Sequence, residues 1–151
     1  MGERRMNRVE FSAEEVPLPP WINSAGVFIR KVLKVLEKDK WDLSVLFCNN
    51  SYIRSLNAKY RKKDEPTDVL SFPLGETSPR GRYLAGDIVV SLEALEENTG
   101  FFKVSGNEEL RRLLVHGILH LAGEDHKTNG AFESMIKKQE EILSIVTEKI
   151  L

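Results

Sequence analysis

The chain has 151 residues, of which 41% are hydrophobic and 30% charged, and its formal net charge is −1. This balance is typical of one globular domain, which we expect to span residues 1–151, and it excludes a disordered or membrane-spanning chain. A chain without excess positive charge is also not expected to coat nucleic acid non-specifically, so any RNA partner must bind at a local basic patch.

Short expected strands alternate with expected helices along the chain. The expected strands lie near residue 10 and at 42–48, 69–72 and 87–92. An amphipathic helix is expected over about 20–38, and Ile53, Leu56 and Tyr60 mark a second helix after it. A connection containing glycine and proline separates the last two strands. This alternation predicts an α/β protein with a mainly parallel or mixed sheet.

The last two expected helices have the clearest signals. Ser105 followed by Glu108 forms a capping box, which is typical of a helix N-terminus, just before the run LRRLLVHGILHLA. Gly123 stands where a residue in the left-handed conformation would end this helix and reverse the chain. A closing helix is expected to cover the core with the stripe Phe132, Met135, Ile136, Gln139, Ile142, Leu143 and Val146.

The single cysteine and the N-terminal stretch indicate the compartment. Cys48 cannot form an internal disulfide and lies in the apolar run LSVLFC, so we expect a buried structural thiol in a reducing environment. The stretch MGERRMNRVEF is charged and lacks the apolar core of a signal peptide. We therefore expect a cytoplasmic protein with no membrane partner.

All three histidines of the chain fall within HGILHLAGEDH at 116–126. His116 and His120 would stand about 40° apart on one helical face, and the reversal at Gly123 would bring His126 back toward them. This spacing is the frame of a zincin-like metal site, and three imidazoles leave one open position on a tetrahedral ion. We predict one divalent ion per chain, with Zn²⁺ as the default and nickel or another divalent ion as alternatives. The alternative is that the histidines are ordinary polar residues near a helix end.

Gly117 decides which hydrolase the frame favours. In a zinc peptidase a glutamate follows the first histidine and takes the proton from the metal-bound water. Glycine has no side chain for this, which disfavours a metallopeptidase. A metal-bound water held by His116 could still act as nucleophile or base, and RNA carries its own 2′-hydroxyl nucleophile. Hydrolysis of a phosphodiester therefore remains open.

The run KYRKK at 59–63 is the one candidate basic patch. Its cations are Lys59, Arg61, Lys62 and Lys63. They are expected either to bind RNA phosphates or to be solvated charges that complement the dipole at a helix end. Taken alone, the run favours the solvated helix end.

Three segments resemble the YbeY family of bacterial metal-dependent endoribonucleases. They are LNAKYRKKDEPTDVLSFP at 56–73, AGDIVVS at 85–91 and HGILHLAGEDH at 116–126, in the order in which the family has them. The chain departs from the family at Glu124, where an aromatic residue is more common. This departure concerns the packing of the loop rather than the set of ligands.

The resemblance implies a four-stranded mixed sheet packed with helices. It also implies hydrolysis of single-stranded RNA in the maturation of the 3′ end of small-subunit rRNA and in ribosome quality control. The implied partners are rRNA and the small ribosomal subunit, with a ribosomal protein or a GTPase as a further partner, and no DNA is expected. Carried over by residue, the family assignments make His116, His120 and His126 metal ligands and Arg61 a catalytic residue placed for RNA.

Other residues of the matched segments have structural alternatives. Thr67 and Asp68 follow a proline, and a turn-forming role is favoured over a catalytic one. Ser71 alternates with apolar residues and is expected to be structural. Asp87 and Asp125 are expected either to support the metal ligands by hydrogen bonds or to have ordinary roles at a strand start and in a loop.

Two rival functions remain open beside the endoribonuclease. The first is a zincin-like metallopeptidase, which Gly117 disfavours. The second is a non-catalytic ribosome-assembly factor in which the metal only organises the C-terminal region. The open fourth coordination position disfavours this second rival, because structural zinc sites usually have four protein ligands.

Overall fold

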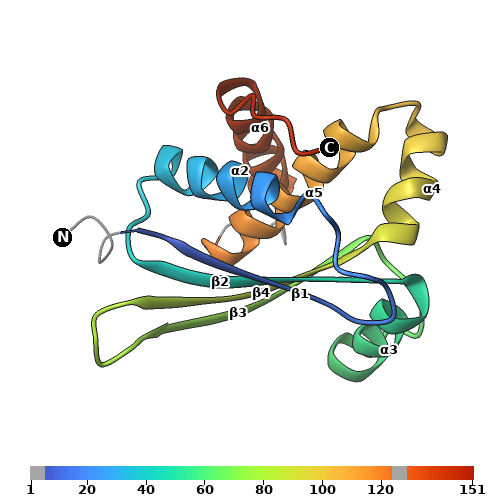
Figure 1. The fold of residues 1–151 in the computed structure, drawn as a ribbon, viewed down its shortest axis with the longest axis horizontal. Helices are drawn as coiled ribbons and strands as arrows, with labels where there is room; N and C mark the ends of the chain where they lie inside the picture. Colours follow the sequence, from blue (N-terminus) through green and yellow to red (C-terminus); the bar gives the residue numbers. More distant parts are fainter. Residues whose placement is uncertain (1–5, 124–128) are drawn as a thin grey trace.

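The computed structural model describes residues 6–123 and 129–151. Figure 1 shows a single sheet with helices on both of its faces. Its four strands are β1 (Arg8–Ala13), β2 (Trp41–Cys48), β3 (Val69–Thr77) and β4 (Tyr83–Ser91). The strand order is β1-β2-β4-β3, in which β1, β2 and β4 run parallel and β3 is antiparallel to β4. The predicted α/β fold with a four-stranded mixed sheet is therefore confirmed.

Five helices accompany the sheet in the described part of the chain. They are α2 (Ile22–Val35), α3 (Asn50–Arg61), α4 (Leu92–Phe102), α5 (Gly106–Leu121) and α6 (Asn129–Ile145). Helix α4 was not expected from the sequence, which placed Leu92 at the end of a strand. The strand instead ends at Ser91, whose hydroxyl oxygen accepts the backbone N–H of Ala94 and so caps the new helix. None of the helices in these ranges is long and apolar enough to span a membrane.

The two faces of the sheet carry cores of different size. Helices α2, α5 and α6 lie over one face, and α3 lies over one end of the other (Figure 1). The larger core joins α2 and α5 to alternate residues of β2 and β4, among them Val45 and Ile88. The smaller core holds Cys48, Ile53, Leu70 and Val89 next to α3. Burial confirms the expected structural thiol, and it raises the pKa of Cys48 to about 12.

The β3–β4 hairpin is longer than the sequence indicated. Strand β3 continues through Pro73, which has no N–H to donate. A strand can contain proline here because β3 lies at the edge of the sheet and needs no hydrogen-bond partner on its outer side. The register shifts between Pro73 and Glu76. Opposite this point, Gly86 has φ 134°, and a Cβ there would lie 2.2 Å from the carbonyl oxygen of Phe72. Only glycine can occupy this position without moving the neighbouring strand.

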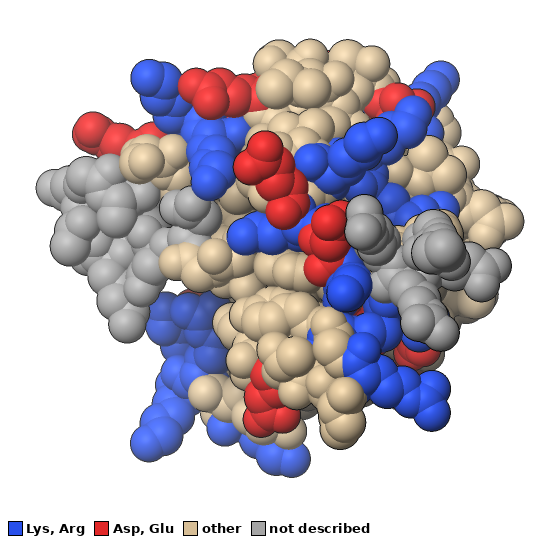
Figure 2. All heavy atoms as spheres, turned by 90° about the vertical axis from the view of Figure 1, so that its left-hand side faces the viewer, with Lys and Arg blue, Asp and Glu red and all other residues tan. Residues whose placement is uncertain are grey.

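The Ser105 cap at the start of α5 and the left-handed conformation of Gly123 after its end are confirmed. The hydroxyl oxygen of Ser105 accepts the N–H of Glu108 at 3.0 Å, and Gly123 follows the helix with φ 89° in the left-handed region. Helix α5 contacts the sheet at β3 and β4 and is flanked by α2, α4 and α6. The histidine-bearing helix is thus held on several sides by the core. On the face shown in Figure 2, both basic and acidic side chains are present.

Candidate functional site

Helix α5 places His116 and His120 on one face, one turn apart. Their Nε2 atoms lie 3.1 Å from each other, and the ring centroids are 4.6 Å apart at an interplanar angle of 67°. Both side chains are half-buried at the edge of the core. The expected common face is therefore confirmed, and it follows from the four-residue spacing on a helix.

This geometry fits two ligands of one metal ion. Two imidazole nitrogens at about 2.0–2.1 Å from a tetrahedral zinc ion stand about 3.3 Å apart, close to the separation in α5. The predicted third ligand, His126, and the predicted supporting residue Asp125 lie outside the described residues. Within residues 6–123 and 129–151, no group of three His, Cys, Asp or Glu side chains is gathered for a metal. The zincin-like three-histidine frame thus stays a prediction.

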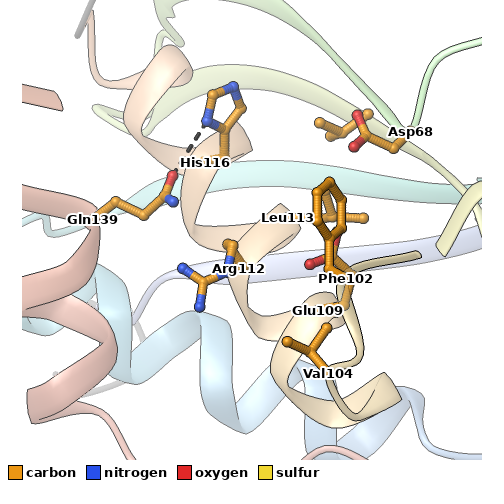
Figure 3. A pocket seen from close by; sticks show the side chains of 9 residues that line it. Asp68, Phe102, Val104, Glu109, Arg112, Leu113, His116 and Gln139 are labelled. Carbon is orange, nitrogen blue, oxygen red and sulfur yellow. Dashed lines mark hydrogen bonds between the residues drawn. The ribbon is translucent and has the colours of Figure 1, made fainter. Parts of the chain in front are cut away.

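Gln139 holds the imidazole of His116 from the neighbouring helix α6. Its Oε1 lies 3.2 Å from His116 Nδ1, and the side chain is only 4% exposed (Figure 3). This hydrogen bond fixes the orientation of the imidazole ring about its Cβ–Cγ bond. A partner of this kind orients metal-binding histidines in many proteins. The sequence contained a signal for this residue, because Gln139 is a polar residue within an apolar helical stripe.

A cavity of about 490 Å³ opens beside His116. Figure 3 shows its lining side chains from α4, α5 and α6 and from the start of β3. The lining residues are Asp68, Val69, Phe102, Val104, Glu109, Arg112, Leu113, His116 and Gln139. The cavity combines an imidazole, a guanidinium, two carboxylates and an apolar wall. It can therefore hold a ligand that is partly apolar and partly charged.

Asn98 holds the two carboxylates of the cavity in place. Its Nδ2 donates to Asp68 Oδ2 at 3.1 Å and to Glu109 Oε2 at 2.9 Å. Glu109 is buried, with 5% of its side chain exposed, so this donor offsets part of the cost of burying a carboxylate. Asp68 was expected to be mainly a turn former. It does lie in the bend before β3, but its side chain also lines the His116 cavity.

Gly117 lies where α5 comes closest to the sheet. A Cβ at this position would lie 2.9 Å from Cγ2 of Ile88, a fully buried residue of β4. The carbonyl oxygen of Gly117 also accepts the hydroxyl of Ser71 at 3.3 Å, which agrees with the structural role expected for Ser71. Position 117 therefore faces the sheet. The missing peptidase glutamate has a packing reason, because there is no room for its side chain.

The basic run lies at the C-terminal end of α3, beyond the other face of the sheet (Figure 1). Its four cations, Lys59, Arg61, Lys62 and Lys63, are exposed. Lys62 ends the helix in the left-handed conformation. Arg61 is not among the described residues that line the cavity of His116. The structure does not bring the two predicted catalytic residues into one described cavity, and the RNA role of Arg61 stays a prediction.

Asp87 is also separated from His116. Its neighbour Ile88 packs beneath α5, so the alternation of β4 directs Asp87 to the opposite face of the sheet. There it accepts the hydroxyl of Ser44 and lines a second cavity of about 530 Å³ with Tyr60 and Phe72. Among the described residues, no contact joins Asp87 to His116 or His120 that would support the histidines as ligands.

Comparison with known proteins identifies the class to which this fold and site belong. The family described as Endoribonuclease YbeY matches residues 9–147. An Endoribonuclease YbeY of Treponema denticola is 51% identical over 120 residues, covering 77% of each chain. That of Treponema pallidum is 43% identical over 143 residues, covering 92% of this chain and 89% of the relative. The chain belongs to the Endoribonuclease YbeY family, as its three matching segments indicated.

A solved structure supports the same fold. The solution structure of a protein from Thermotoga maritima superposes with a TM-score of 0.58 at 29% identity. The match covers 90% of this chain and 89% of the other. The fold described above is thus shared over nearly the whole chain.

Proposed function

We propose that this chain is a metal-dependent endoribonuclease that hydrolyses phosphodiester bonds of single-stranded RNA in the cytoplasm. The observation that carries the proposal is the His116–His120 pair, whose Nε2 spacing suits two ligands of one ion beside a cavity. His126 is proposed as the third ligand from its spacing after Gly123. Zn²⁺ is the default ion for imidazole ligands, with nickel or another divalent ion as alternatives.

The described side chains would prepare the site in three ways. When bound, the ion would supply Lewis acidity and a water with its pKa lowered toward about 7. His116 and His120 offer their Nε2 atoms from a helix that the core holds in place. Gln139 fixes the ring of His116, so that the ligand nitrogen needs no reorientation. Arg112 lines the same cavity and is ion-paired with Glu140 of α6, and the remaining N–H groups of its guanidinium can contact a phosphate.

The basic run at the end of α3 is proposed as the second contact with RNA. Asp64 is the first acidic residue after the run, and it forms an ion pair with Arg54 at 2.9 Å, which lowers the pKa of Asp64. The partner of this carboxylate is therefore Arg54 of α3 rather than one of the four cations of the run. Arg61 is proposed to grip a phosphate with two N–H groups, while Lys59, Lys62 and Lys63 attract the backbone less specifically. Lys63 and Asp68 are five residues apart, so their Cα atoms lie at most about 18 Å from each other, a distance that a few nucleotides can span.

The cellular role proposed is the maturation of small-subunit rRNA, including its 3′ end, together with ribosome quality control. Family membership supports the cleavage of RNA that this role requires, because relatives with 43–51% identity bear the name Endoribonuclease YbeY. The proposed partners are rRNA and the small ribosomal subunit, with a ribosomal protein or a GTPase as a further partner.

The central experiment compares wild type with His116→Ala on single-stranded RNA and on an unstructured peptide, both after loading with Zn²⁺. We expect wild type to cleave RNA and leave the peptide intact, and His116→Ala to lose the RNA cleavage. Metal content, measured in parallel, should fall sharply in His116→Ala, His120→Ala and His126→Ala. Peptide cleavage that depends on His116 would favour the metallopeptidase. Metal binding without cleavage of either substrate would favour the assembly factor.

The role of Arg61 is tested by a matched pair of substitutions. Arg61→Lys retains the charge but loses the two-pronged geometry, and we expect single-turnover cleavage to slow by about a hundredfold or more if Arg61 stabilises the reacting phosphate. Arg80→Lys is the control, because Arg80 is also exposed but lies between β3 and β4. Equal rates for Arg61→Lys, Arg80→Lys and wild type would return Arg61 to a solvated charge at a helix end.

A further inference from the structure

Two adjacent aromatic rings stand in solvent at the end of α4. Phe101 is 80% exposed and Phe102 58% exposed, and neither belongs to the cores on the two faces of the sheet. Their rings contact each other edge to face, with centroids 5.0 Å apart. The two rings therefore bury little apolar surface within this chain, and exposed apolar patches often mark a binding surface.

Phe102 also lines the cavity that contains His116. Figure 3 shows its ring on the far side of the cavity from Gln139, with His116 and Arg112 of α5 between them. Val104 and Leu113 extend the apolar surface near the ring. The cavity thus has an aromatic and apolar side, on which the carboxylates of Asp68 and Glu109 are held by Asn98, and a side with an imidazole and a guanidinium.

This division matches the chemistry of a nucleotide. A nucleobase is a flat ring that stacks on aromatic side chains regardless of its identity, whereas the phosphate carries the charge. Lys103 directly follows Phe102 and is exposed, so a further cation lies next to the aromatic pair in the chain. Aromatic rings interleaved with cations are typical of surfaces that bind single-stranded nucleic acid.

We propose that Phe102 forms a nucleobase subsite, in which an unpaired base of the RNA substrate next to the scissile phosphate stacks on its ring. The subsite rests on the proposed function, because it places the base beside the His116 site. Phe101 contacts Phe102 edge to face but is not among the described residues that line the cavity. Because stacking accepts every base, the subsite favours unpaired strands over duplexes, whose bases are already stacked on their neighbours. It thereby provides a physical basis for single-strand preference.

The test measures stacking directly, with a short RNA whose sugars carry 2′-O-methyl groups so that it lacks the 2′-hydroxyl nucleophile. The fluorescent base 2-aminopurine is placed at one position at a time. Its fluorescence is expected to be quenched at one position on binding to wild type, because stacking quenches this base. Phe102→Leu retains an apolar side chain but should lose this quenching and bind about tenfold more weakly. Phe102→Trp should restore both, and Phe101→Leu is the matched control and should bind within twofold of wild type.

A second oligonucleotide, abasic at the quenched position, completes a cycle of substitutions. The missing base should weaken binding to wild type about tenfold and have little effect on Phe102→Leu, since the partner of the base is already absent. Equal affinity of wild type and Phe102→Leu for the intact strand would overturn the subsite. So would a double change, Phe102→Leu with the abasic strand, whose loss of affinity equals the sum of the two single losses. Cleavage of unmodified RNA separates the two proposals. Cleavage that requires His116 but is indifferent to Phe102→Leu overturns the subsite alone, whereas absence of both binding and cleavage overturns both.

Discussion

Replacing Gly117 by alanine tests whether the close approach of α5 to the sheet dictates the residue at this position. The new Cβ would lie 2.9 Å from Ile88 Cγ2 and 3.1 Å from its Cγ1 and Cδ1. Ile88 is fully buried, and Cγ2 is attached to its branched Cβ, so it cannot swing away without displacing neighbours. Overpacking costs about 1–3 kcal/mol, whereas alanine gains about 1 kcal/mol over glycine in a helix interior. We expect the free energy of unfolding to fall by about 1 kcal/mol.

The sign of this effect should reverse when Ile88 is shortened. Ile88→Ala removes all three atoms that the new Cβ would meet, at its own cost of about 2–5 kcal/mol. In that background, Gly117→Ala should raise the free energy of unfolding by about 1 kcal/mol, because only the gain in helix propensity remains. Gly100→Ala in α4 is the matched control, since a Cβ there would meet nothing within 4 Å. It should be stabilising in either background.

Urea unfolding followed by circular dichroism measures these differences, with the same excess of Zn²⁺ in every sample. Two-state fits give the free energy of unfolding, and unchanged m-values would show that the denatured state is unaffected. If Gly117→Ala were as stabilising as Gly100→Ala in the wild-type background, the argument that packing selects glycine would be refuted. The absence of a peptidase base would then need another explanation.

Three further predictions concern buried polar groups. Gln139→Ala should weaken Zn²⁺ binding about 10- to 100-fold, measured by competition with a chelator, because His116 loses the acceptor that orients its ring; unchanged affinity would contradict this role. Asn98→Leu should lower the free energy of unfolding by about 1–3 kcal/mol in urea, because buried Glu109 loses its donor; an unchanged midpoint would count against it. Cys48 should resist alkylation at pH 8 in the native state and react on unfolding, because burial raises the pKa of its thiol to about 12; rapid native labelling would disprove this. Because the pKa of Cys48 is 9.0 in the unfolded chain and about 12 in the folded protein, the protonated thiol contributes to the free energy of unfolding. This contribution is fully present below pH 9 and is lost as the pH rises toward 12.

The elements that the sequence located correctly are those with strong local patterns. The amphipathic run at 20–38 contains α2, and the run at 42–48, with its β-branched and aromatic residues, matches β2 to within one residue. Helix α4 was not predicted, because it buries only Ala94 and Leu95 and so has no long apolar stripe in its sequence. The extension of β3 past Pro73 was not predicted either. Proline is tolerated in a strand only at an edge of the sheet, and only the strand order shows that β3 lies there.

The sequence by itself determined the common face of His116 and His120, because residues four apart on a helix are neighbours whatever surrounds them. It also determined that no base follows the first histidine. Only the tertiary structure decided which other side chains join this pair. Gln139, Asp68 and Phe102 come from α6, from the start of β3 and from α4, and their approach to His116 depends on how distant segments pack. Packing also explains Gly117, since the helix periodicity that aligns the histidines says nothing about how near Ile88 lies.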